Sequence, residues 1–130
     1  MPATFSRTFG RGLVVAAALL LLLDGVVQFA SPAGLVAALV HIGFPRDAGP
    51  TLAYLTFCCA LPLLLPRLAP LGAILTTGYL GGAICAHARI GELLAPPQFV
   101  CAALGGGIWI GLALADQRIA AALRPFAPPD

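Results

Sequence analysis

The chain has 130 residues, of which 60% are hydrophobic and 9% are charged, and its formal net charge is +2. Soluble domains carry roughly a quarter charged residues, so these few charges cannot cover a water-facing surface. The small and dispersed positive charge also excludes a nucleic-acid-binding protein. The composition therefore predicts an integral membrane protein of one domain, residues 1–130, whose surroundings are the lipid bilayer.

Four stretches are long and apolar enough to cross a bilayer, which takes about 17 to 25 residues. They cover residues 12–30, 49–65, 71–88 and 97–115. Because the hydrocarbon core offers the backbone no water, each stretch is expected to be a helix. Pro62 is expected to kink the end of the second one. The sequence thus predicts an all-α bundle of four transmembrane helices.

The first stretch also has features of a signal peptide, because Arg7 and Arg11 precede an apolar run of suitable length. Against this alternative, apolar sequence continues past Asp24 to Phe29. No clean small-x-small cleavage site follows it. A membrane span is therefore the preferred interpretation.

A short segment, "SPAGLVAALVHIGFPRDAGP" at 31–50, separates the first two spans. Ser31 and Pro32 form an N-cap and first-turn signal, and Gly43 is part of a stop signal. Three apolar residues share one face at helical spacing: Leu35, Leu39 and Ile42. His41 points away from that face. This pattern predicts a short helix that lies in the outer membrane interface or re-enters the membrane slightly.

The arginines predict the orientation of the spans. Five lie on the side of the termini and two on the other side: Arg7, Arg11, Arg67, Arg118 and Arg124 against Arg46 and Arg89. This distribution places both termini in the cytoplasm. The chain has no lysine and is rich in alanine, glycine and proline, which is typical of a GC-rich bacterial genome. We therefore expect a multi-pass protein of the bacterial inner membrane.

Polar residues interrupt two of the spans. Asp24 lies just beyond the middle of the first span, where an isolated charge costs about 3 kcal/mol or more. Gln28 follows one turn later on the same face. On the third span, Tyr79 and His87 share a helical arc of about 80° with Thr76 and Ala83. Six side chains are expected to converge in the outer half of the bundle: Asp24, Gln28, His41, Tyr79, His87 and Arg89.

Two interpretations of these polar residues stay open. In one, Asp24 is a neutral or salt-bridged acid that holds two helices together. In the other, the acid and a histidine form a protonatable pair beside a cavity for a hydrophobic, redox-active or proton-coupled ligand. No metal site is predicted, because two histidines on different segments are weak evidence for one.

Glycines are concentrated in "TTGYLGGA" and "LGGGIWIG". They are expected to let helices pack closely: Gly78, Gly81, Gly82, Gly105, Gly106, Gly107 and Gly111. A phosphate-binding loop is excluded, because no strand precedes them and the chain has no lysine. The four cysteines contain no C-x-x-C pair and are expected to act as small apolar residues. A disulfide between Cys85 and Cys101 stays open.

Four pieces of the sequence occur in the order typical of one family: "DGVVQF" at 24–29, "HIGFP" at 41–45, "PRLAPLGAILTTGYLGGA" at 66–83 and "HARIG" at 87–91. With them the chain resembles the DoxX-like family of small four-helix bacterial membrane proteins. Gln28 stands where family members usually have a lysine. Phe44 replaces the tyrosine of the family's H-x-G-Y-P motif.

The resemblance implies a link to quinone chemistry, because the family takes its name from a subunit associated with a terminal quinol oxidase and thiosulfate:quinone oxidoreductase. It assigns no catalytic residue. We expect an accessory subunit or partner of a membrane redox system rather than an enzyme on its own, one that shapes either a quinone-accessible or a proton-conducting site. A quinone is the candidate ligand, and a membrane oxidoreductase is the candidate partner. The alternatives are a catalytically silent scaffold and a small transporter, which would need to form a homo-oligomer.

Overall fold

The computed structural model describes residues 2–124, with side chains from residue 4 onward, so residue 1 and residues 125–130 of the predicted domain lie outside the described part. The described residues contain no strand, and the all-α prediction is confirmed. Their helices are α1 (Pro2–Ala30), α2 (Ala33–His41), α3 (Ala48–Leu64), α4 (Ala69–Arg89), α5 (Pro96–Ala115) and α6 (Gln117–Leu123).

Three of the described helices are long and apolar enough to cross a membrane: Thr4–Ala30 within α1, and all of α4 and α5. They contain the predicted spans 12–30, 71–88 and 97–115. The predicted span 49–65 corresponds to α3, which is also apolar but has only 17 residues. α1 begins well before the predicted residue 12, and its 29 residues extend about 44 Å at 1.5 Å per residue.

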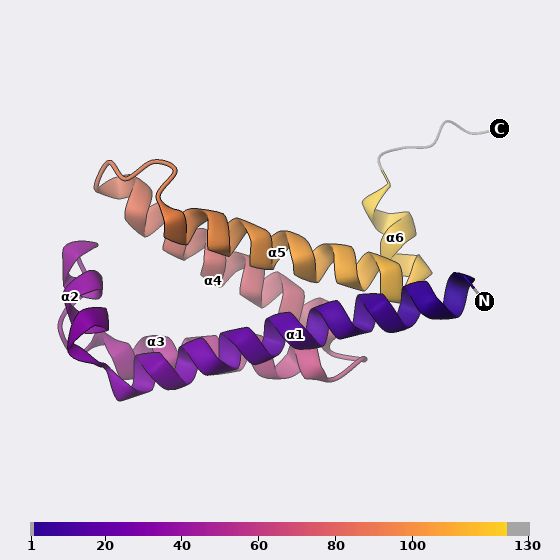
Figure 1. Ribbon diagram of the computed structural model, residues 1–130, viewed down its shortest axis with the longest axis horizontal. Helices are drawn as coiled ribbons and strands as arrows, with labels where there is room; N and C mark the ends of the chain where they lie inside the picture. The colour runs from indigo at the N-terminus through magenta and orange to yellow at the C-terminus, as the bar shows by residue number, and fades with distance from the viewer. Residues whose placement is uncertain (1, 125–130) are drawn as a thin grey trace.

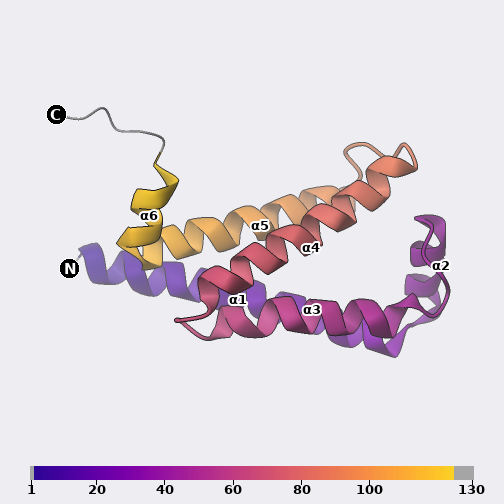
Figure 2. The same ribbon diagram turned by 180° about the vertical axis from the view of Figure 1, so that it is seen from behind.

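The long helices form a bundle in which α1 and α4 each pack against both α3 and α5. The start of α1 lies at the same end of the bundle as α6 (Figures 1 and 2). We call this the arginine end, because it carries Arg7, Arg11, Arg67, Arg118 and Arg124. The opposite end carries α2 and the loop between α4 and α5, and we call it the histidine end after His41 and His87. Toward that end, α4 and α5 diverge from α1 and α3 (Figure 1).

At the arginine end, two pairs of helices approach closely at glycines. A Cβ on Gly10 would lie 2.5 Å from the Gly111 carbonyl oxygen and 2.7 Å from the Leu114 Cβ, so the backbones of α1 and α5 are in contact there. Gly72 of α4 packs in the same way on Leu63 of α3, whose backbone nitrogen lies 2.8 Å from where a Cβ would be. The bundle is therefore closed at this end by contacts that only glycine permits.

The glycines predicted to pack helices behave differently from one another. Gly111 lies in the α1–α5 contact, and a Cβ on Gly105 would be at an ordinary distance of 3.7 Å from Leu80. A Cβ on the other five would have no neighbouring heavy atom within 4 Å: Gly78, Gly81, Gly82, Gly106 and Gly107. Close packing within the chain therefore depends on Gly111 and on glycines outside the two predicted clusters, such as Gly10 and Gly72.

The short helix α2 lies across the histidine end, where the helices diverge (Figure 2). Its first turn differs from the prediction. Ser31 has φ 47° and its hydroxyl donates to the Gln28 carbonyl at 2.8 Å, while Pro32 occupies the N-cap position. Gly43, with φ 92°, ends the helix as predicted. Leu39 and Ile42 are buried, Leu35 of the same predicted face is partly buried, and His41 is exposed on the other side.

Candidate functional site

A cavity of about 360 Å³ lies beneath α2, where α3 and α4 diverge. Its walls are largely apolar and come from α1, α2, α3, α4 and the turn after α2: Gln28, Leu35, Leu39, Ile42, Phe44, Leu52, Leu55, Gly78, Tyr79, Gly82 and Ala83. Gly78 and Gly82 contribute no side chain, and a Cβ on either would point into open space. The glycines of α4 thus make room for the cavity rather than for a neighbouring helix.

Two polar side chains line this cavity, Gln28 from α1 and Tyr79 from α4. The Tyr79 hydroxyl accepts a hydrogen bond from Gln28 Nε2 at 3.0 Å and donates one to Gln28 Oε1 at 3.2 Å. Gln28 is 5% exposed, which makes it one of the few buried polar residues of the bundle. The two groups bond to each other, and rotation of the Tyr79 O–H can turn either a donor or an acceptor toward the otherwise apolar space.

Asp24 lies one turn before Gln28 and accepts a hydrogen bond from Gln28 Nε2. Asp24 is exposed. Among the side chains of the described residues, the Gln28 amide is its hydrogen-bond partner. The carboxylate is within electrostatic range of Tyr79 on α4 and Cys101 on α5. Asp24 is therefore connected to α4 through Gln28, and not by a direct hydrogen bond to another helix.

A second polar cluster holds α2 against the end of α4. His41 Nε2 lies 2.7 Å from Glu92 Oε1, and His87 Nδ1 lies 2.7 Å from Glu92 Oε2. Arg89 donates to the Ile42 carbonyl at the C-terminus of α2, at 3.0 Å. We call His41, His87, Arg89 and Glu92 the α2 clamp. Since α2 forms one wall of the cavity, the clamp fixes that wall.

The six polar residues predicted to converge thus fall into two groups, one at the cavity and one in the clamp. His87 follows Tyr79 by two helical turns, or about 12 Å along α4. Glu92 was not among the predicted site residues, although it is the only glutamate in the chain and closely follows a histidine at a helix end. A lone glutamate shortly after a histidine at a helix end is the feature of the sequence that could have indicated this ion pair.

The clamp changes the acidity of its central carboxyl group. Hydrogen bonds from His87 and, second, from His41 hold the pKa of Glu92 below its ordinary value of 4.5. When folding lowers the pKa of a carboxyl group, that group stabilises the folded state. The stabilisation is fully present at a pH above the pKa of the group in the unfolded chain. This contribution is lost as the pH falls through the lowered value. The clamp is therefore expected to weaken in acid.

We expect this weakening to appear as faster amide exchange in α2. Protection of the α2 amides, corrected for intrinsic exchange rates, should decrease as the pH falls below about 4.5 in hydrogen-exchange mass spectrometry. Glu92→Gln removes the titrating group. The α2 amides of this variant should therefore show low protection that does not decrease further in acid. Asp47→Asn, a matched loss of an exposed carboxylate, should keep the decrease. An equal decrease in Glu92→Gln would contradict the clamp.

Residues 2–124 contain no group of three histidine, cysteine or acidic side chains that could hold a metal ion. In the clamp, the two histidines bind different oxygens of Glu92 and do not converge on one point. Cys85 and Cys101, whose pairing the sequence left open, are free thiols, as are Cys58 and Cys59.

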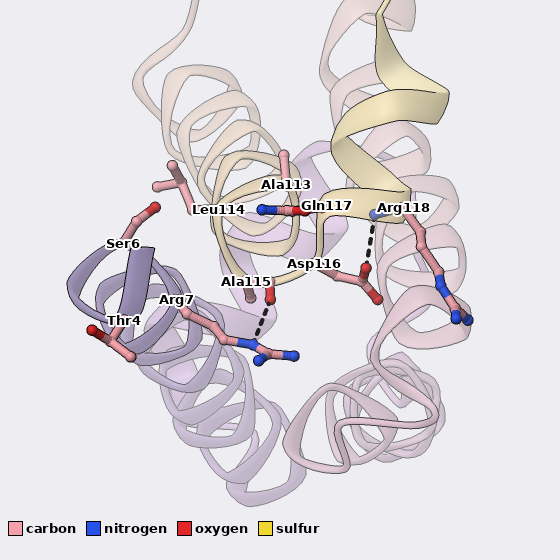
Figure 3. Close-up of a pocket in the computed structure, with 9 residues that line it drawn as sticks. All are labelled: Thr4, Ser6, Arg7, Ala113, Leu114, Ala115, Asp116, Gln117 and Arg118. Atoms are coloured by element: carbon pink, nitrogen blue, oxygen red, sulfur yellow. Dashed lines mark hydrogen bonds between the residues drawn. The ribbon is translucent and has the colours of Figure 1, made fainter. Parts of the chain in front are cut away.

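Another hollow, of about 510 Å³, lies at the arginine end, far from both polar groups (Figure 3). It is lined by the first turns of α1 and by the elbow between α5 and α6: Thr4, Ser6, Arg7, Ala113, Leu114, Ala115, Asp116, Gln117 and Arg118. Arg7 Nε donates to the Ala115 carbonyl at 3.2 Å. Asp116 Oδ1 accepts from the Arg118 backbone nitrogen at 2.8 Å and caps α6.

Large hydrophobic side chains are exposed along all the long helices, among them Leu20, Leu61, Leu71 and Ile110. Together with the long apolar helices, they define a small helical membrane protein. The chain belongs to the DoxX-like family, whose sequence model matches residues 12–110. This confirms the resemblance found in the sequence. No curated protein and no solved structure matches the chain.

Proposed function

We propose that this protein is an accessory member of a quinone-linked redox system and that the cavity beneath α2 holds a quinone headgroup. The observation that carries the proposal is the polar pair, Gln28 and Tyr79, in an otherwise apolar cavity. A quinone is a flat apolar ring whose oxygens accept hydrogen bonds when oxidised and donate them when reduced. The amide and the hydroxyl offer a partner for either form. The cavity volume of about 360 Å³ is within the range of small-molecule sites.

Each polar side chain has a separate part in this proposal. Tyr79 donates to a quinone carbonyl oxygen by turning its O–H away from Gln28 Oε1, while Gln28 Nε2 continues to donate to the hydroxyl and keeps it in place. Asp24 accepts from Gln28 Nε2 and so fixes which way the amide points. A bound quinone supplies the redox chemistry, while these residues bind it, orient it and exclude water. The α2 clamp holds the apolar cover over the site.

The proposed setting is the bacterial inner membrane, with four spans. α3 supports the fourth span: it packs along α1 and α4, and its 17 residues extend about 26 Å, close to the roughly 30 Å of a hydrocarbon core. α2 would then lie in the outer interface and the arginine end would face the cytoplasm with both termini. The excess of arginines at that end supports this orientation.

Replacing Tyr79 by phenylalanine tests the polar pair. The ring remains, so the fold should be retained, but one hydrogen bond to the quinone is lost, at a cost of about 1 kcal/mol or roughly fivefold in affinity. Binding of a short-tailed ubiquinone analogue can be followed by quenching of Trp109, the only tryptophan. Tyr54→Phe is the matched control, because Tyr54 is the other tyrosine and is exposed. Equal affinity of both variants would contradict the proposed contact.

A catalytically silent scaffold is a second candidate. Gly106 is exposed on α5 with no neighbouring atom at its Cβ position, and Gly81 on α4 has the same open surroundings. Such positions allow a helix of another membrane protein to approach closely. A scaffold would show no saturable quinone binding, and Tyr79→Phe would leave its partner binding unchanged. The same titration therefore separates the two candidates.

A further inference from the structure

We infer that the hollow at the arginine end is a binding site for the phosphate of an anionic phospholipid. Its position supports a lipid ligand. α1 is about 44 Å long, so even at a typical tilt of about 20° it extends beyond a hydrocarbon core of about 30 Å. The exposed and stacked rings of Phe5 and Phe9, 6.4 Å apart, lie in the same turns as Arg7. Apolar rings next to an arginine suit the boundary between acyl chains and headgroups.

The charges of the hollow favour an anion. Arg7 and Arg118 both line it, and in Figure 3 the carboxylate of Asp116 lies between their guanidinium groups. Asp116 is the one acidic residue among the lining residues, and its Oδ1 is already engaged as the N-cap of α6. The ion pairs within residues 2–124 join only histidines to Glu92, so neither arginine is neutralised by a salt bridge.

Arg7 is also positioned for this role. Its Nε donates to the Ala115 carbonyl, which fixes the guanidinium and leaves its two terminal nitrogens for a ligand. Arg11 lies one turn later on α1, and its terminal nitrogens already donate to the carbonyls of Leu63 and Leu64 at the end of α3. The guanidinium plane matches the geometry of phosphate oxygens, and the hydroxyls of Thr4 and Ser6 line the same hollow.

The test is native mass spectrometry of the full chain in mild detergent, titrated with phosphatidylglycerol or with phosphatidylcholine. Arg118→Gln is expected to reduce phosphatidylglycerol binding about fivefold. Arg67→Gln is the matched control, since it removes one charge from the same end but lies outside the hollow, and it should bind like the original chain. Arg118 lies on the exposed surface of α6, so its loss is not expected to disturb the fold.

Three results would overturn the inference. Equal binding of the two lipids would show that the headgroup charge is not recognised. Equal losses in Arg118→Gln and Arg67→Gln would show a diffuse attraction of the whole arginine end. Displacement of phosphatidylglycerol by inorganic phosphate at low millimolar concentration would assign the hollow to a soluble phosphate compound instead. None of these results depends on whether the cavity at the other end binds a quinone.

Discussion

Replacing Gly10 by alanine is expected to destabilise the bundle by roughly 1–3 kcal/mol. The added Cβ would lie 2.5 Å from the Gly111 carbonyl oxygen and 2.9 Å from the Ala115 nitrogen, both of which are backbone atoms that cannot rotate away. α1 would have to move off α5 at the point where the bundle is closed. The loss is measured by unfolding the purified protein in detergent with heat or denaturant.

Gly12→Ala is the matched control for this prediction. Gly12 lies two residues further along the same helix, and a Cβ there would meet no atom within 4 Å. Both substitutions bring the same gain in intrinsic helix propensity, up to about 1 kcal/mol. The difference between the two variants therefore reports the α1–α5 contact alone. Equal stability of the two variants would mean that the helices do not cross at Gly10.

Filling the cavity is expected to abolish quinone binding without unfolding the protein. A leucine at position 82 would project from α4 into the space beneath α2, where a Cβ finds no neighbouring atom within 4 Å. The headgroup and the leucine side chain cannot occupy this space together. We expect Gly82→Leu to weaken binding of the short-tailed ubiquinone at least about tenfold, which is 1.4 kcal/mol or more. Trp109 quenching provides the measurement.

Gly81→Leu provides the control on the same helix. Gly81 has equally open surroundings but does not line the cavity. Gly81→Leu adds the same leucine side chain to α4 as Gly82→Leu does, but about 100° around the helix from position 82. Its affinity for the quinone should match that of the original chain. If both leucine variants lose affinity to the same degree, the ligand does not occupy this cavity.

Much of the fold could be predicted because lipid leaves a long apolar segment no choice but helix. The predicted 71–88 and 97–115 lie within one or two residues of α4 and α5. The start of the first helix could not be found in this way. Arg7 and Arg11 end the apolar run, yet the helix continues through them to Pro2. Their side chains reach carbonyl groups of α5 and α3, which hydropathy does not report.

The candidate site was harder to predict because it depends on where helices diverge. Helical spacing placed Asp24 and Gln28 on one face, and in the structure they form a hydrogen bond. Spacing alone could not show that the α4 glycines open a cavity between Tyr79 and α2. Glu92 reaches both histidines because the loop turns sharply, with positive φ at Gly91 and Leu94. The shape of such a turn depends on tertiary contacts, which the spacing of residues in the sequence does not reveal.

The central claim is that the cavity beneath α2 binds a quinone in the membrane. Its most direct test is to purify the protein gently from its native membrane, extract it with organic solvent and quantify quinone per chain by mass spectrometry. We expect stoichiometric quinone on the original chain and on Gly81→Leu, and little on Gly82→Leu. If the original chain carries only bulk phospholipid, or if Gly82→Leu carries as much quinone as it does, the claim is contradicted.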